Sequence, residues 1–348
     1  MADETPSSHT ASLPALLGEL GVSLIATTSS GSVLVVRGER GRVTVDEHLL
    51  AGAAAIGVAP GWLALAGADE VWELVEQPAM VARPGERLDA LYVPHRRLPL
   101  GGSRPCELFR GSDGATWMVD SGGSGLATIE PGVGVVPRWS SGPALAEEDR
   151  TLNGVAVSAG VARYVTAVGP VDDELARRQG RVAGGVVIEV DSGEIIAAGL
   201  GLPHSPRLHD SRLWVLESAF GVLATVDRAT GRRTTVCALP GFPRGLAFVG
   251  HLAVVGLSPS PDGHDRTAGV AVVDIRSGAL VALLHCGAAV PDVVDLQVLP
   301  HRSPTLLELD DDVLVTSHLL PDTPRHELAP DLRPTAASPP DHLDRSHP

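Results

Sequence analysis

The sequence contains few aromatic residues, few cysteines and no long apolar run. Aromatic side chains make up 3% of the chain although 44% of its residues are hydrophobic, so valine, leucine, alanine and isoleucine have to fill the core. The three cysteines, Cys106, Cys237 and Cys286, lie far apart without a CxxC spacing. This pattern excludes a zinc ribbon and a disulfide framework, and it fits a reducing cytoplasm.

Export signals and excess positive charge are lacking as well. The N-terminal stretch MADETPSSHTASLPALLGELG has no basic segment followed by a long apolar core, and no run of 18 apolar residues follows it. The 27 Lys and Arg residues face 42 Asp and Glu residues, which gives a net charge of −15 and disfavours a surface that follows nucleic-acid phosphates. We therefore expect a soluble, cytoplasmic protein with neither a nucleic-acid nor a membrane partner.

What the chain does contain is a recurring series of short β-type runs. The segments VVIEVDSGEIIAAG, LATVDRATGRRTTV and VAVVDIRSGALVALL each place an Asp and a Gly in a turn between two apolar runs, which is typical of a hairpin. The second strand of each series is expected to begin near residues 22, 62, 117, 163, 213 and 252, on average 46 residues apart. This spacing is the length of a four-stranded propeller blade.

The two ends of the series are complementary. From Val22 the chain supplies the second, third and fourth strands of a blade. Val293 to Pro300 supplies a first strand that no further strands of the same blade follow in the sequence. Joined, they complete a sixth blade and remove an open sheet edge. Two separate β-sandwiches would also give short strands and frequent turns, but they would not explain these ends.

We therefore predict an all-β protein, a six-bladed β-propeller over residues 21–318 closed by its N-terminal and C-terminal strands. A leader at residues 1–20, with a short helical stretch from Leu13 to Leu20, and a disordered tail at residues 319–348 complete the predicted organisation. Two internal segments interrupt the repeat. Gln77 to Gly102 carries four prolines and is expected to cross one face as an extended loop, and Gly169 to Gly184 is expected to form a short helix or a lid.

Polar residues gather just before or at the start of the expected innermost strands. Because these strands line the axis of a propeller, their starts should meet at one mouth of a central channel. The residues combine acids, arginines, an amide, an imidazole and a thiol, which suits a polar or anionic ligand. The candidate site comprises Cys106, Glu148, Asp149, Arg150, Asn153, His204, Ser205, Arg207, Arg244 and Asp295.

His204, Arg150 and Arg244 are the candidate catalytic residues. His204 stands between two prolines and serves either as a base or metal ligand, or in a structural hydrogen bond to a neighbouring blade. The arginines, Arg207 included, either clamp a carboxylate or phosphate or pair with the nearby acids in a structural ring.

The remaining candidates are ligand-binding residues with structural alternatives. Asn153 either contacts the ligand or bonds to the backbone at a strand start. Cys106 is either a ligand or nucleophile, or a small buried residue.

Five motifs together resemble a family of uncharacterised bacterial propeller proteins with a domain of unknown function. They are EEDRTLNGVAV, PHSPR, RLWVLES, PGFPRGLAF and AVVGLS, and the resemblance covers residues 18–300. It implies a propeller fold and no settled reaction. Members have EDRCHLNG where this chain has EDRTLNG with Thr151, and TGDLDIHD where it has LGGSRPCE, ending in Cys106 and Glu107. Two of three histidines are thus absent, which implies a diverged or degenerate member.

Three functions remain open, and we favour the first. It is the binding of a small molecule or peptide at the channel mouth, with or without a modest catalytic step. The second is a metal-dependent hydrolase or lactonase in which Glu148, Asn153 and Asp295 hold a divalent ion. The third is a protein-interaction scaffold that uses residues 77–102 and the tail. The sequence has no Walker loop and no nucleophile elbow, and it determines neither the reaction nor the oligomeric state.

Overall fold

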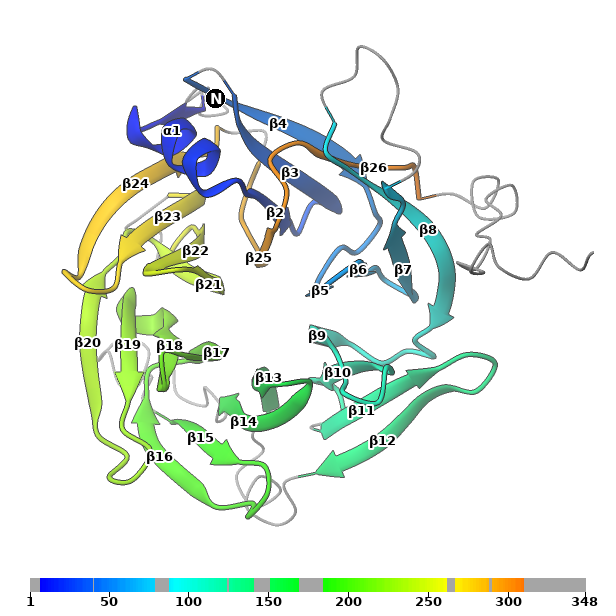
Figure 1. Ribbon diagram of the computed structural model, residues 1–348. Helices are drawn as coiled ribbons and strands as arrows, with labels where there is room; N and C mark the ends of the chain where they lie inside the picture. Colours follow the sequence, from blue (N-terminus) through cyan, green and yellow to red (C-terminus); the bar gives the residue numbers. More distant parts are fainter. Residues whose placement is uncertain are drawn as a thin grey trace, which may run out of the picture. The chain divides into compact units, whose positions relative to one another are not determined.

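The predicted propeller is confirmed. The computed structural model describes residues 7–39, 41–78, 88–123, 125–140, 151–168, 184–261, 267–287 and 290–309. These residues form six mainly antiparallel sheets, or blades, placed radially around one axis (Figure 1). No helix in these ranges is long and apolar enough to span a membrane.

Each blade runs from an innermost strand at the axis to an outermost strand at the rim. From the axis outward, blade 1 consists of β25 (Asp295–Leu299), β2 (Ser23–Thr27), β3 (Ser32–Glu39) and β4 (Arg42–Leu49). Blade 2 consists of β5 (Ile56–Ala59), β6 (Trp62–Ala66), β7 (Glu70–Glu76), β8 (Ala90–Pro99) and β26 (Pro304–Leu306). Blade 3 consists of β9 (Pro105–Arg110), β10 (Thr116–Asp120), β11 (Gly125–Glu130) and β12 (Gly134–Ser140).

The other three blades follow the same order. Blade 4 consists of β13 (Thr151–Ser158), β14 (Val161–Val168), β15 (Gly185–Glu189) and β16 (Ile195–Leu200). Blade 5 consists of β17 (Pro203–His209), β18 (Arg212–Glu217), β19 (Val222–Val226) and β20 (Arg233–Ala238), with a short 3-10 turn at Ser218–Phe220. Blade 6 consists of β21 (Phe242–Val249), β22 (Leu252–Ser258), β23 (Gly269–Asp274), β24 (Ala279–His285) and β1 (Ser8–His9).

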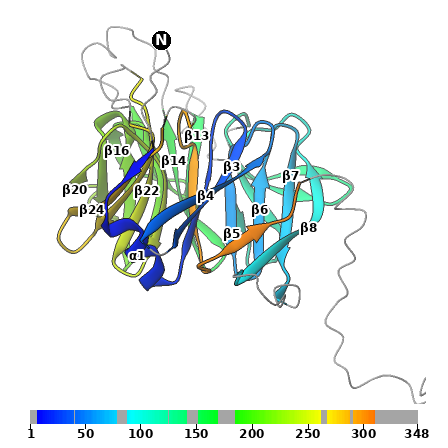
Figure 2. The same cartoon turned by 90° about the horizontal axis from the view of Figure 1, so that it is seen from above.

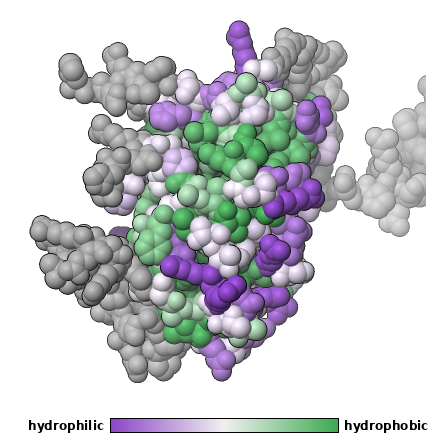
Figure 3. Space-filling view, turned by 90° about the vertical axis from the view of Figure 1, so that its left-hand side faces the viewer, coloured by the Kyte–Doolittle hydropathy of each residue, from purple (hydrophilic) through white to green (hydrophobic). Residues whose placement is uncertain are grey.

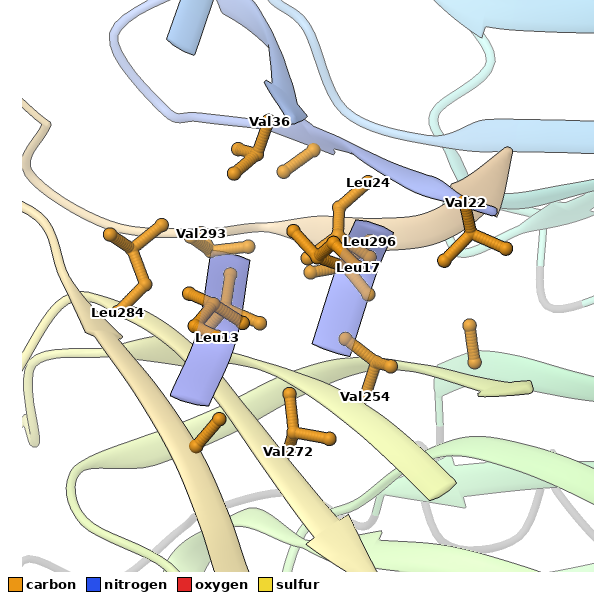
Figure 4. Close-up of a cluster of buried hydrophobic side chains, with 14 of the residues drawn as sticks. Leu13, Leu17, Val22, Leu24, Val36, Val254, Val272, Leu284, Val293 and Leu296 are labelled. Carbon is orange, nitrogen blue, oxygen red and sulfur yellow. The ribbon is translucent and has the colours of Figure 1, made fainter. Parts of the chain in front are cut away.

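Blade 1 closes the ring as predicted. β25 pairs antiparallel with β2, from Ser23 opposite Leu299 to Thr27 opposite Asp295. Helix α1 (Ser12–Leu20) packs on β3, β4 and β24 beside this closure (Figure 2). The helix buries Leu13 and Leu17, one turn apart, against side chains of blades 1 and 6 (Figure 4). The junction of the chain ends therefore has an apolar core of its own.

The outer edges of two blades are covered by chain ends. Along β24, Thr10 donates its backbone N–H to Leu283 O at 2.9 Å, and Ser12 Oγ donates to Val281 O at 2.9 Å. On blade 2, β26 pairs in parallel with the start of β8. Covered edges cannot pair with another chain. The rim is nevertheless not uniformly polar: on the side that carries β20 and β24, hydrophobic and hydrophilic surfaces alternate (Figure 3), and Leu280 is 42% exposed.

The prediction of an extended loop from Gln77 to Gly102 is wrong for most of the described residues in this range, because Ala90–Pro99 forms strand β8. Two of the prolines that favour a loop in the sequence lie within this strand. Pro94 lies at a register shift opposite Leu74, and Pro99 is the last residue of the strand. An outer strand tolerates proline because the missing N–H faces away from its single long partner. The expected helix or lid at Gly169 to Gly184 lies outside the described residues except for its last residue.

A buried carboxylate links blades 2 and 3. Glu73 on β7 is 1% exposed and accepts hydrogen bonds from Arg96, from Thr116 and, at 3.2 Å, from Arg110. Trp62 adds an indole N–H at 3.3 Å. Burial by itself raises the pKa of Glu73, but the hydrogen bonds and the two guanidinium groups hold the pKa below its usual value.

We expect Glu73→Gln to lower the free energy of unfolding by about 2–4 kcal/mol, because it removes a buried charge that two arginines and a hydroxyl surround. The matched control is Glu70→Gln on the same strand. Glu70 is part-exposed and lies 3.5 Å from Arg97, so its loss should cost less than about 1 kcal/mol. Urea denaturation measures both, and equal losses would contradict the linking role of Glu73.

Candidate functional site

Four innermost strands carry a β-bulge near their start. The extra residue is Cys106 in β9, Asn153 in β13, Ser205 together with Pro206 in β17, and Gly245 in β21. Gly245 has a φ of +72°, and a Cβ there would lie 2.4 Å from Leu296 N, so only glycine fits between blades 6 and 1. Bulges bend a strand and re-aim its side chains, and here they mark the motifs that the sequence analysis selects.

Arg207 forms the centre of an interblade network. Its Nη1 donates to Glu107 Oε2 at 3.0 Å, to Val155 O at 3.1 Å and to Pro206 O at 2.8 Å, and its Nε donates to Leu246 O at 2.8 Å. Glu107 also accepts the Val155 N–H at 2.9 Å. One guanidinium group thus connects blades 3, 4, 5 and 6. Among the residues that the structure describes, its acidic partner is Glu107.

Asp295 is a buried carboxylate at the start of β25. Its oxygens accept the backbone N–H groups of Ile56 and Leu296, each at 2.8 Å, and the residue is 2% exposed. Burial, followed by the charge of Glu107, raises the pKa of Asp295 to about 7, although Arg207 acts in the opposite direction. Asp295 therefore joins blade 1 to blade 2 and is close to the Glu107–Arg207 pair.

His204 is fixed in one tautomer. Its Nδ1 lies 2.9 Å from Leu202 O and 2.8 Å from Ser218 Oγ, while Ser218 Oγ donates to Pro243 O at 2.6 Å. A carbonyl oxygen can only accept, so the proton is on Nδ1 and the lone pair is on Nε2. Burial, followed by the charge of Arg244, lowers the pKa of His204 to about 4. The imidazole is thus neutral at pH 7, with an acceptor nitrogen that makes no hydrogen bond within the described ranges.

Arg244 differs from Arg207 in having no such partners. Its Nε is buried without a hydrogen-bond partner, and its guanidinium forms no ion pair among the residues that the structure describes. It is near two other candidates, because its charge lowers the pKa of His204 and opposes the rise in the pKa of Cys106. The charge of Arg244 in blade 6 therefore acts on His204 in blade 5 and on Cys106 in blade 3.

The other candidates in the described ranges have mainly structural contacts. Burial, and then the charges of Glu107 and Asp295, raises the pKa of the Cys106 thiol well above its usual value, which does not suit a nucleophile. Ser205 Oγ accepts the Gly245 N–H at 3.2 Å. Asn153 Nδ2 donates to Pro203 O at 2.6 Å, whereas its Oδ1 is buried without a partner.

Three candidates lie outside the described ranges, and the candidate site residues did not include two contributors, Glu107, which stands beside Cys106 in the sequence, and Ser218. Glu148, Asp149 and Arg150 lie in residues 141–150, outside the described ranges. Glu107 pairs with Arg207 across 100 positions, and Ser218 orients His204. A polar residue directly after a second strand, as in RLWVLES, is the only signal that pointed to Ser218.

The described residues do not fit a divalent metal ion well. No group of three or more His, Cys, Asp or Glu side chains in these ranges could hold one. Both oxygens of Asp295 already accept backbone N–H groups, and two guanidinium groups are near the cluster. We therefore derive no metal-dependent step from this site.

Fold and site together define a six-bladed β-propeller whose axis is lined by interblade polar contacts. The chain belongs to the family described as Domain of unknown function (DUF4915), which matches residues 11–307. The comparison with curated proteins found no match.

Two solved structures support the fold. A chain of a nidogen/laminin complex has 13% sequence identity and a TM-score of 0.55, with 81% of this chain and 100% of that chain covered. A protein of unknown function from Bacteroides caccae has 13% identity and a TM-score of 0.52, with 80% and 99% covered. At these identities the likeness shows the propeller alone.

The two arginines should differ in their effect on stability. We expect Arg207→Gln to lower the free energy of unfolding by about 3–5 kcal/mol, because it leaves Glu107 buried and unpaired. Arg244→Gln should cost less than about 1 kcal/mol, because it breaks no ion pair with another residue that the structure describes. Urea denaturation of the two variants measures the contrast, and a larger loss for Arg244→Gln would contradict these assignments.

The state of His204 predicts a pH effect. The folded pKa of His204, about 4, is below the ordinary value of 6.5, so the native state binds fewer protons than the unfolded chain between these values. Its contribution to stability is therefore complete above pH 6.5 and decreases as the pH falls towards 4. We expect His204→Gln to lose this part of the pH dependence of unfolding. The exposed variant His9→Gln is the control and should keep the wild-type slope.

Proposed function

We propose that the axial cluster binds a small molecule with a carboxylate or phosphate group, and that Arg244 is its main cationic contact. The observation that carries this proposal is the guanidinium of Arg244, which has a buried, unpartnered Nε and no ion pair in the described ranges. A partly buried charge without a partner is costly, and a bound anion would offset that cost through charge-assisted hydrogen bonds.

Two further groups support a ligand with a hydrogen-bond donor. The neutral His204 presents an acceptor at Nε2, and Asn153 has a buried Oδ1 without a partner. Neither group would attract an anion by itself, because both are acceptors. A hydroxyl or amino group beside the anionic group would satisfy them, so a hydroxy acid, an amino acid or a phosphate monoester with a free hydroxyl fits this set best.

The proposal assigns binding and no reaction. The raised pKa of Cys106 and the low pKa of His204 leave neither a strong nucleophile nor a strong base among the described groups. The three free cysteines fit a cytoplasmic location, which is part of the proposal. A nucleic-acid or membrane partner is not part of it, because the net charge is −15.

Thermal unfolding in the presence of phosphate, lactate and serine tests the proposal. We expect at least one of these ligands to raise the Tm of the wild type, because a ligand that binds only the folded state adds about 2.7 kcal/mol at a hundredfold excess over its Kd. Arg244→Gln should abolish the shift.

The matched control is Arg212→Gln, at an exposed arginine on β18. It should keep the wild-type shift. Equal shifts in wild type and Arg244→Gln, or no shift with any of the three ligands at about 100 mM, would contradict an anion site at Arg244.

A further inference from the structure

A pocket lies between blades 3 and 4, and none of the axial candidate residues lines it. It has a volume of about 230 Å³, and its lining includes Phe109, Trp117 and Trp139 from blade 3 and Val161 and Val190 from blade 4. The whole chain has only five Trp, four Phe and two Tyr residues, so three of its eleven aromatic rings meet here. A core otherwise built from aliphatic side chains makes this concentration of rings unusual.

The aromatic side chains are held in place by their own contacts. Phe109 and Trp117 are stacked with ring centroids 5.8 Å apart. The indole N–H of Trp117 donates to Asp113, with both oxygens at 3.2 Å, and the indole N–H of Trp139 donates to Val190 O at 3.0 Å across the blade boundary. Both indole donors are therefore used inside the protein. A ligand in this pocket meets aromatic rings and no free indole N–H.

The charges at the rim of the pocket are negative. Asp113 and Asp191 both belong to its lining. Asp191 forms an ion pair with Arg163 at 2.9 Å, but their side chains are 67% and 44% exposed, so this pair is weak and can open. Aromatic rings attract cations through their negative faces, and the carboxylates act in the same direction.

We propose that this interblade pocket binds a small organic ammonium ion, with a quaternary ammonium group as the best fit. A quaternary ammonium ion has no N–H to donate, so it needs only aromatic contact and nearby negative charge. The volume of about 230 Å³ is below the roughly 300–1,000 Å³ of pockets for drug-sized ligands and suits such a compact group. The proposal does not depend on the anion site at the axis.

Choline and its uncharged isostere 3,3-dimethylbutan-1-ol are the probes. In the full-length chain labelled with ¹⁵N-tryptophan, each of the five tryptophans gives one indole signal. We expect choline to shift the signals of Trp117 and Trp139 in a saturable way and to leave that of the fully buried Trp214 unchanged. The isostere should shift them at least about tenfold less at equal concentration, because it lacks the charge that the rings and carboxylates attract.

The outcomes are decisive in either direction. Equal shifts with choline and the isostere would show an apolar pocket without preference for a cation and would overturn the proposal. The absence of any shift at about 100 mM choline would overturn it as well.

A charge variant adds a second readout. Asp113→Asn keeps an oxygen acceptor for the Trp117 indole and removes one rim charge, so the Kd for choline should rise about fivefold, as expected for one exposed charge at contact distance. The matched control Asp227→Asn changes an exposed aspartate in a blade 5 turn and should leave the Kd unchanged. A Kd unaffected by Asp113→Asn would contradict the role of the rim charge.

Discussion

The innermost strand of every blade is an edge strand, and its unpaired backbone groups face the axis. This constraint explains most of the polar side chains found there. Glu107 accepts the N–H of Val155 from the next blade, Ser205 accepts that of Gly245, and Asp295 accepts that of Ile56. Buried backbone groups without partners are costly, so these side chains replace the neighbouring strand that an inner edge lacks.

The same pattern holds at the ends of the second strands. Hydroxyl groups of Thr27, Ser218 and Ser258 each donate to a carbonyl just before or at the start of the next innermost strand, at Ala54, Pro243 and Val293. These hydrogen bonds attach blade 1 to blade 2, blade 5 to blade 6 and blade 6 to blade 1, in addition to apolar packing. Because this structural demand uses most of the axial polar groups, the few that it leaves unused stand out. Within the described ranges they are the guanidinium of Arg244, Nε2 of His204 and Oδ1 of Asn153.

The sequence predicted the architecture well because the repeat is local. Second strands spaced 46 residues apart on average, together with the unpaired run after Val293, determined both the number of blades and the closure. Strand β8 was missed because its prolines argue against a strand. Proline disfavours a strand that is hydrogen-bonded along both edges, but β8 has only one long neighbouring strand, β7. The sequence does not show in advance that a run will be outermost.

The sequence selected the axial residues as a group of polar strand starts, but their partners were not predictable. Arg207 and Glu107 are 100 positions apart, and their pairing depends on how neighbouring blades tilt and on a one-residue bulge in each strand. The cluster around Glu73 was missed for the same reason, since its four partners come from four different strands of two blades. The repeat length in the sequence identifies each blade. To predict which side chains pair, one must also know how the strands of different blades are aligned.

The bulges also separate residues that bond to another blade from His204 and Arg244, which we propose as ligand contacts. Leu152, His204 and Arg244 each directly precede the bulge of their strand, whereas Val155, Arg207 and Leu246 follow it and make the interblade bonds. In blades 5 and 6 the residue before the bulge is polar. Within the described ranges, its side chain makes no hydrogen bond to the backbone of another blade. A side chain there can therefore change without loss of the ring. In blade 4 this position holds the buried Leu152, so the polar group of that blade comes from the bulge residue Asn153 instead.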